Sequence, residues 1–167
     1  MTSTEIRAVR LEELPTLLQL AHRSWHDHYP GIITVKQIDY MLALGYEPTV
    51  LERELAEGTR IDVLMHGANM IGFMSFGPAK AGNVKLHKCY LDVGAHVKGL
   101  GQQMLDHVAI ASKDMGAQTL SLRVNKENRK PFRRMNAVVL RSLNRWLMTS
   151  ATVSSWTTTP CPLPCSA

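Results

Sequence analysis

The sequence predicts an α/β fold of the α+β kind, in which helices flank a central sheet. Three observations point to it. Apolar residues recur at helical spacing early in the chain, they alternate with a period of two in the middle, and a glycine-rich turn later joins a strand to another helix. The 167 residues are enough for one domain with a full apolar core.

The first third of the chain predicts one strand followed by helices. Residues 5–10 have the pattern of a short strand, and Pro15 suits the first turn of a helix. Thr34 can cap a second helix, and residues 48–57 predict a short third one. The first helix carries an apolar stripe with offsets 0, 3, 4, 7 and 11, formed by Leu14, Leu17, Leu18, Ala21 and Trp25.

The middle of the chain predicts strands and then a helix. Residues 60–76 form a hairpin, and residues 83–93 form a strand that is apolar on both faces, as central strands are. Residues 99–115 return to helical spacing, residues 119–124 alternate as a further strand, and residues 125–132 begin another helix. The order is therefore one strand, two or three helices, three strands, a helix, a strand and a helix.

Composition excludes several classes of protein. No stretch of about 18 apolar residues predicts a membrane span, and the first residues lack the pattern of a signal peptide. Three cysteines do not make a disulfide framework, so a reducing, cytoplasmic setting is expected. We expect no membrane partner, and the oligomeric state is left open, a homodimer included.

The charge of the chain is unevenly distributed. The net charge is +5, but residues 1–132 contain 15 Lys and Arg against 14 Asp and Glu, whereas residues 133–167 contain four Arg and no acid. The body is therefore close to neutral and the excess lies in the C-terminal segment. A basic surface that would bind nucleic acid is not expected.

The segment with most chemical information is residues 91–104, where a glycine-rich turn lies between a strand and a helix. Gly99 and Gly101 let the backbone approach a ligand closely, and a helix start offers unpaired N–H groups to a pyrophosphate. Lys98 adds a positive charge. Neither a P-loop nor a dinucleotide-binding glycine pattern is present. The alternative is a tight turn that binds nothing.

Residues 4–132 resemble the GNAT superfamily of acetyl-CoA-dependent N-acetyltransferases. The family loop Gln/Arg-x-x-Gly-x-Gly/Ala corresponds to the stretch from His96 to Gly101, with His in place of Gln or Arg. Asn125 and Asn128 fit the family's entry to the next helix. The stretch from residue 26 to residue 42 is most similar to the PaiA-type polyamine acetyltransferase branch.

The resemblance implies a mixed, mostly antiparallel sheet whose fourth and fifth strands splay apart to admit acetyl-CoA. It also implies transfer of an acetyl group to a primary amine, on a small molecule or a peptide N-terminus, by direct attack in a ternary complex. A non-catalytic acyl-CoA-binding or regulatory module is the alternative. The residues that would bind acetyl-CoA are Leu91, Asp92, Val93, His96, Val97, Lys98, Gly99, Leu100, Gly101, Gln102, Asn125 and Asn128.

Candidate catalytic and acceptor residues follow from the same resemblance. His87 is the candidate base, because some family members carry a catalytic histidine on this strand and an ordinary imidazole titrates near neutrality. A histidine that faces solvent or packs under a helix is the alternative. Trp25, His28 and Tyr29 are expected to form the acceptor pocket, unless they pack as an aromatic hinge on the sheet. No metal is expected, since His22 and His26 have no evident third ligand.

The chain departs from the family pattern after residue 132. In another reading frame the codons from residue 133 on can spell Ala-Tyr-Glu-Arg-Cys-Gly-Phe, the family's continuation, and the junction of Met135 and Asn136 forces its Glu. The junction of Met148 and Thr149 likewise forces an Asp. These forced residues indicate a frameshift, the loss of one base near codons 133–134, with a genuine but divergent C-terminus as the alternative.

A frameshift has structural and chemical consequences. We expect an acetyltransferase domain over residues 1–132 and an aberrant, poorly ordered tail over residues 133–167, with the C-terminal strands missing or altered. The edge of the 119–124 strand would then be exposed. The tail also lacks the tyrosine that the family uses as an acid, so activity is expected to be weak or absent.

Overall fold

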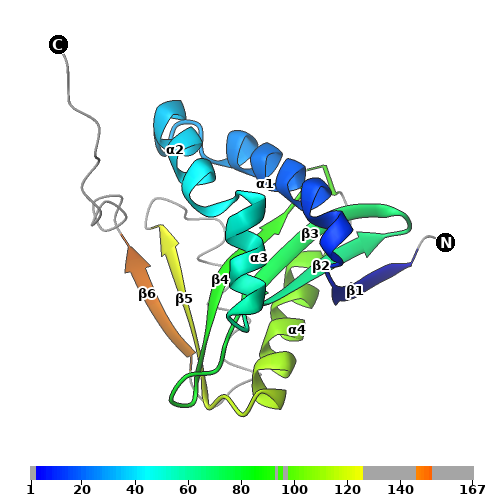
Figure 1. The fold of residues 1–167 in the computed structure, drawn as a ribbon, viewed down its shortest axis with the longest axis vertical. Helices are drawn as coiled ribbons and strands as arrows, with labels where there is room; N and C mark the ends of the chain where they lie inside the picture. The colour runs from blue at the N-terminus through cyan, green and yellow to red at the C-terminus, as the bar shows by residue number, and fades with distance from the viewer. Residues whose placement is uncertain (1–2, 93, 96–97, 126–145, 152–167) are drawn as a thin grey trace.

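The computed structural model describes residues 3–92, 94–95, 98–125 and 146–151 as one sheet with helices on both faces (Figure 1). In these ranges the strands follow chain order across the sheet: β1 (Thr4–Ala8), β2 (Arg60–His66), β3 (Asn69–Phe76), β4 (Asn83–Leu91), β5 (Thr119–Asn125) and β6 (Trp146–Ala151). The helices are the 3₁₀ turn η1 (Leu11–Glu13), α1 (Leu14–His28), α2 (Val35–Gly45), α3 (Pro48–Ala56) and α4 (Leu100–Asp114).

The sheet is mixed and mostly antiparallel, which confirms the predicted fold class. Strands β1 to β4 pair as antiparallel neighbours, whereas β4 and β5 run parallel. Parallel neighbours need a crossover connection, and α4 supplies it between β4 and β5. The 60–76 hairpin, the 119–124 strand and the 99–115 helix are found within one or two residues of their predicted bounds.

Two apolar cores lie on opposite faces of the sheet, one under α1, α2 and α3 and one under α4. The predicted stripe of α1 is buried at Leu14, Leu17, Ala21 and Trp25. On the other face, Met104 and Val108 of α4 are completely buried against strands β3 to β5. The sheet is therefore covered on both faces, and its functional groups lie at strand ends and at the parallel pair.

Local sequence explains where the helices on either side of the sheet begin. The Thr34 hydroxyl accepts a hydrogen bond from the Gln37 N–H at 3.2 Å and caps α2, as predicted. Gly99 precedes α4 with φ at +89°, a conformation that favours glycine. Gly72 of β3 has another role, because a Cβ there would lie 3.2 Å from Cε of Met104 and 3.1 Å from the Tyr90 carbonyl oxygen. It lets α4 approach the sheet.

The prediction that the edge of the 119–124 strand is exposed is wrong, because β6 pairs with β5 along its length. The pairing is parallel and runs from Leu120 opposite Trp146 to Asn125 opposite Ala151. Backbone pairing requires no particular side chain, so an extended segment within reach can cover a free edge whatever its sequence. The helix expected from residue 125 on and most of the 133–167 tail lie outside the described residues.

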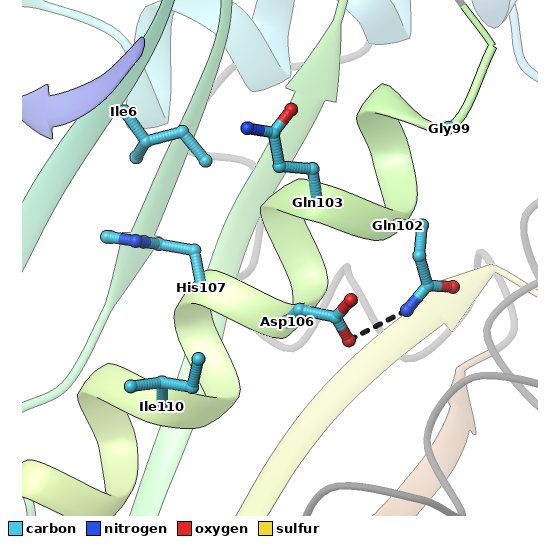
Figure 2. Close-up of a pocket in the computed structure, with 7 residues that line it drawn as sticks. All are labelled: Ile6, Gly99, Gln102, Gln103, Asp106, His107 and Ile110. Carbon is cyan, nitrogen blue, oxygen red and sulfur yellow. Dashed lines mark hydrogen bonds between the residues drawn. The ribbon is translucent and has the colours of Figure 1, made fainter. Parts of the chain in front are cut away.

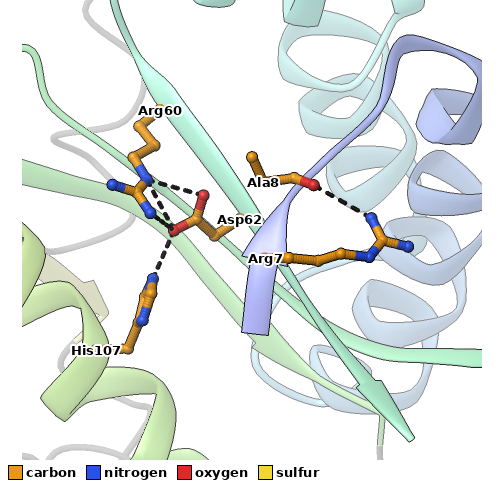
Figure 3. Close-up of polar contacts among 5 residues, drawn as sticks. All are labelled: Arg7, Ala8, Arg60, Asp62 and His107. Carbon is orange, nitrogen blue, oxygen red and sulfur yellow. Dashed lines mark hydrogen bonds and ion pairs between the residues drawn. The ribbon is translucent and has the colours of Figure 1, made fainter. Parts of the chain in front are cut away.

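A buried carboxylate joins β2 to α4 (Figure 3). The Asp62 side chain is completely buried; it accepts hydrogen bonds from Nε of Arg60 at 2.9 Å and from Nε2 of His107 at 2.6 Å. Burial alone would raise the Asp62 pKa, but the hydrogen bonds from His107 and Arg60 outweigh it and lower the pKa. The ionised carboxylate therefore ties the sheet to the helix.

We expect Asp62→Asn to destabilise the protein at pH 7 by about 1–3 kcal/mol, because a neutral amide with one acceptor oxygen replaces a buried carboxylate that accepts from both Arg60 and His107. The lowered pKa means that this stability is present above the ordinary pKa of a carboxyl group and is lost as the pH falls through the folded value. Urea unfolding at pH 7 and near pH 3 should show the difference shrink at the lower pH. Asp39→Asn is the control, since Asp39 also contacts a histidine but is exposed. Equal effects of the two substitutions would contradict the assignment.

Candidate active site

The parallel strands β4 and β5 part halfway along their length. They pair from Asn83 opposite Thr119 to Leu86 opposite Leu122, and β4 then continues to Leu91 without a ladder to β5. Backbone groups of an antiparallel strand alternate in direction. The Asp92 N–H donates to the Ile71 carbonyl of β3 at 2.8 Å, so the backbone groups of Leu91 face the opposite side, where β4 has left β5.

The free edge of β4 leads into the turn that precedes α4. Asp92 organises this turn: its Oδ1 accepts the Gly94 N–H at 2.9 Å, and its Oδ2 lies 3.6 Å from the Arg23 guanidinium of α1. Helix α4 then starts at Gly99 with no side-chain cap. The first helical hydrogen bond is from the Gln103 N–H to the Gly99 carbonyl, which leaves the preceding N–H groups without helical acceptors.

The structure therefore brings most of the described cofactor candidates together. Leu91 ends β4, Lys98 is exposed beside the start of α4, and Leu100, Gly101 and Gln102 form its first turn. The Leu100 side chain is buried in the core, and the Gln102 amide donates to Asp106 at 2.7 Å (Figure 2), so these two residues offer their backbone. Asn125 is the last residue of β5. Four candidates lie outside the described residues: Val93, His96, Val97 and Asn128.

His87 occupies an irregularity in β4. Ser75 pairs with Lys88 and Phe76 with Leu86, so His87 is an extra residue on its strand, as in a β-bulge. Its Nε2 donates to the Gly77 carbonyl at 2.7 Å, which leaves a lone pair on Nδ1. Partial desolvation lowers the His87 pKa, and Lys85 and Lys88 lower it further. The ring is therefore neutral and able to accept a proton at neutral pH.

His87 faces a cavity of about 490 Å³ between α3 and β4, which we call the α3–β4 cavity. Its lining comes from the end of α3 and the turn after it, from the connection between β3 and β4, and from the first half of β4. The lining residues are Arg53, Glu54, Glu57, Thr59, Gly77, Pro78, Lys80, Asn83, Lys85 and His87. The first half of β4 therefore lines this cavity, and the second half of the same strand has the free edge.

A buried ion pair lies next to this cavity. The Lys88 ammonium is 2.5 and 2.7 Å from the two Glu54 oxygens and 5.4 Å from the centre of the Tyr46 ring. Lys88 is 9% exposed and Glu54 is 25% exposed, so the carboxylate is the partner that reaches water. A charge as buried as Lys88 requires such a partner, since an isolated ammonium would be expensive to desolvate.

The aromatic acceptor candidates pack on the sheet. Trp25 and Tyr29 are 2% and 6% exposed; their rings lie against Tyr90, Tyr46 and each other, and Tyr29 and Tyr46 are hydrogen-bonded to Tyr90. His28 stacks edge-on against Tyr29, and its Nε2 is buried without a hydrogen-bond partner. These side chains form the wall above β4 and surround no described cavity of their own.

A second cavity of about 460 Å³ lies along α4 on the side of β1 (Figure 2). Ile6, His107 and Ile110 contribute to it, together with Gly99 and Gln102 at the start of the helix. The His107 imidazole is already bonded to Asp62, so its role is structural. Among the described residues, no group of three or more His, Cys, Asp or Glu could hold a metal ion.

The Cys89 thiol also bears on the chemistry of the site. Burial raises the pKa of the Cys89 thiol to about 12, so this cysteine stays protonated and is a poor nucleophile.

No helix in the described part of the chain has both the length and the apolar character to cross a membrane.

The profile of the acetyltransferase (GNAT) family matches residues 16–134 of the chain. The chain belongs to this family. Spermidine N(1)-acetyltransferase of Thermoplasma acidophilum is 28% identical over 135 residues, which is 78% of this chain and 83% of the relative.

Solved GNAT structures share the fold. The PaiA N-acetyltransferase of Thermoplasma acidophilum, solved in complex with coenzyme A, has a TM-score of 0.75 at 24% identity and covers 81% of this chain and 87% of its own. The ribosomal-protein-S18-alanine N-acetyltransferase of Escherichia coli has a TM-score of 0.62 at 16% identity, with 81% and 76% covered.

Sequence reasoning missed the Lys88–Glu54 pair and the contact of Arg23 with Asp92. Lys88 belongs to the strand pattern over residues 83–91, where a lysine ordinarily predicts an exposed position. Nothing in the sequence pairs it with a glutamate 34 residues away. The pair between Glu54 of α3 and Lys88 of β4 can be recognised only when the tertiary structure places α3 against β4.

We expect Glu54→Leu to destabilise the GNAT domain more than Lys88→Met does. The first substitution leaves a buried ammonium unpaired and costs about 3–5 kcal/mol, whereas the second leaves a carboxylate that can reach water and costs about 1–3 kcal/mol. The double variant should return to within about 1 kcal/mol of the wild type. Urea unfolding of the four proteins measures these values. Additive effects in the double variant would show that the two charges do not compensate each other.

Proposed function

We propose that this GNAT protein transfers an acetyl group from acetyl-CoA to a primary amine by direct attack in a ternary complex. The observation that carries the proposal is that two sets of unpaired backbone groups lie on consecutive elements: the free edge of β4 at Leu91 and the N–H groups at the uncapped start of α4. An extended ligand could add to a strand edge there and end in a phosphate group at a helix N-terminus. The structure of the relative with coenzyme A supports this assignment.

The described residues fit acetyl-CoA, which supplies the acetyl group as a thioester. Backbone groups of Leu91 would bind the extended pantetheine arm, and the backbone N–H groups of Gly101 and Gln102 would bind the pyrophosphate. Lys98 would add a positive charge beside them. Gly99 leaves space toward the described residues, none of which has an atom within 4 Å of a Cβ built there. Val93, His96, Val97, Asn125 and Asn128 complete the proposed cofactor site.

Proton transfer is the role we propose for His87. An amine must lose a proton to become a nucleophile, and a neutral imidazole whose Nε2 is held by Gly77 can accept it at Nδ1. The protonated Cys89 thiol supports direct transfer without an acyl-cysteine. Trp25, His28 and Tyr29 remain proposed acceptor residues that would act from behind β4, since none of them lines the α3–β4 cavity.

The acceptor class that we propose is a small amine or a peptide N-terminus. One relative is a spermidine acetyltransferase and another acetylates the alanine of a ribosomal protein, so both kinds of amine occur among proteins similar to this one.

A non-catalytic acyl-CoA-binding module is the second candidate, and the C-terminal segment favours it. The family match ends at residue 134, next to the boundary that we propose at residue 132. Every described cofactor group lies before that boundary, whereas the family's tyrosine acid would follow it. Binding of acetyl-CoA should therefore survive in this chain even if turnover does not.

Gly99→Asp should weaken binding of coenzyme A at least about tenfold relative to Gly99→Asn. The two side chains have nearly the same size, and both residue types tolerate a positive φ, so the comparison isolates a negative charge beside the pyrophosphate. Isothermal titration calorimetry with coenzyme A measures the difference, which should shrink at high salt. Equal affinities of the two variants would remove the pyrophosphate from this site.

Restoring the reading frame at codons 133–134 should raise the acetylation rate per folded molecule by about 10²–10⁴-fold, the usual contribution of one positioned acid or base. Thiol release with amine acceptors measures the rate, and coenzyme A affinity is measured in parallel. In the restored protein, His87→Ala should lower the rate and should remove the rise of rate with pH, which lies below the ordinary imidazole pKa because the His87 pKa is lowered. An unchanged rate in His87→Ala would assign the base to another group, and equal rates of the two frames would refute the role of the family's tyrosine as the acid.

A further inference from the structure

The α3–β4 cavity is the place where the acceptor would lose its proton. A general base has to lie within hydrogen-bond distance of the proton that it removes, or one water away from it. His87 lines this cavity, so the acceptor amine would enter it; this step rests on the proposed function. The charges on the cavity walls then decide which amines can enter.

The cavity walls carry an excess of positive charge. Glu54 and Glu57 are its two acids, whereas Arg53, Lys80 and Lys85 are its cations. Glu54 is already neutralised by Lys88, which is not part of the lining. One acid and three cations remain, an excess of two positive charges while His87 is neutral.

The two lysines are free to act on a ligand. Lys80 lies in the connection between β3 and β4, and Lys85 is in the first half of β4; both are exposed. Within the part of the chain that the structure describes, neither forms an ion pair. A ligand that entered the cavity would therefore meet uncompensated ammonium groups.

We propose that the acceptor of this protein carries an anionic group, such as a carboxylate, at the end opposite to its reacting amine. Lys80 and Lys85 would hold that group, and Glu57 would favour the entering ammonium. The second ammonium of a polyamine would meet the same lysines and be repelled. The acceptor class therefore differs from spermidine, the substrate named for a relative. Amino acids and peptides that combine an amine with a carboxylate fit the cavity.

Three amines with the same six-carbon chain test this inference on the full chain saturated with coenzyme A. They are 6-aminohexanoate, hexylamine and 1,6-diaminohexane, whose far ends are negative, neutral and positive. Binding is followed by calorimetry and by the NMR signals of the His87 ring. We expect affinity to fall in that order, by about fivefold or more per step, and the differences to shrink as salt is added.

Substitutions test whether Lys80 and Lys85 cause the preference for a negatively charged acceptor. Lys80→Gln and Lys85→Gln should each reduce the preference for 6-aminohexanoate over hexylamine about fivefold, because each removes one of the charges that attract the carboxylate. Lys113→Gln is the matched control: it removes the same charge from an exposed position on α4, across the sheet, and should leave the preference unchanged. 2-Aminoethyl phosphate and β-alanine, compared with each other, distinguish a phosphate from a carboxylate.

The outcomes separate this inference from the proposed function. Binding of 1,6-diaminohexane as tight as or tighter than that of 6-aminohexanoate overturns the inference, and coenzyme A affinity then still reports on the cofactor site. An unchanged preference in Lys80→Gln and Lys85→Gln also overturns it. The expected order in a protein without affinity for coenzyme A would support the charged cavity and refute acetyl transfer.

Discussion

The parting of β4 from β5 after Leu86 is the constraint on which the rest of the structure depends. From Asn83 to Leu86 strand β4 pairs with β5, whereas the second half of β4, up to Leu91, pairs on the β3 side alone. Unpaired N–H and C=O groups on a strand edge favour an extended ligand, because they provide directional bonds without any side chain. Helix α4 is the next element of the chain after this edge, and the proposed cofactor would contact both. The candidate cofactor site is thus built mainly from backbone.

Packing on both faces keeps the strands and helices at this site in place. On one face, α1 and α3 press Trp25 and Leu51 against the sheet, and on the other α4 buries Met104 over Gly72. The buried Asp62 carboxylate adds a polar tie between β2 and α4. Because α4 is fixed by apolar contact along its length and by this tie, its first turn is presented in one orientation. A helix held only at its far end would not offer a constant set of N–H groups to a ligand.

The charged residues on and beside β4 affect both the protonation of His87 and the charge of the α3–β4 cavity. Lys88 is buried and paired, and His87 next to it is kept neutral, so the strand carries a proton acceptor between an apolar wall and the α3–β4 cavity. Lys85, which helps to lower the His87 pKa, also contributes to the positive excess of the cavity. This positive charge therefore has two effects: it favours the neutral form of His87 at neutral pH, and it favours an acceptor that carries a negative charge.

The sequence by itself determined the local features of this protein. Apolar spacing located α1 and α4, alternation located the β2–β3 hairpin, and Gly99 marked the start of α4, because each depends on residues only a few positions apart. The resemblance to GNAT proteins added the order of the sheet. Tertiary structure alone decided the pairing of β6 with β5, the extra residue at His87 and the bond between Lys88 and Glu54. These depend on which distant segments meet, and a strand edge or a buried charge takes whatever partner the fold brings within hydrogen-bond distance. No local pattern encodes that choice.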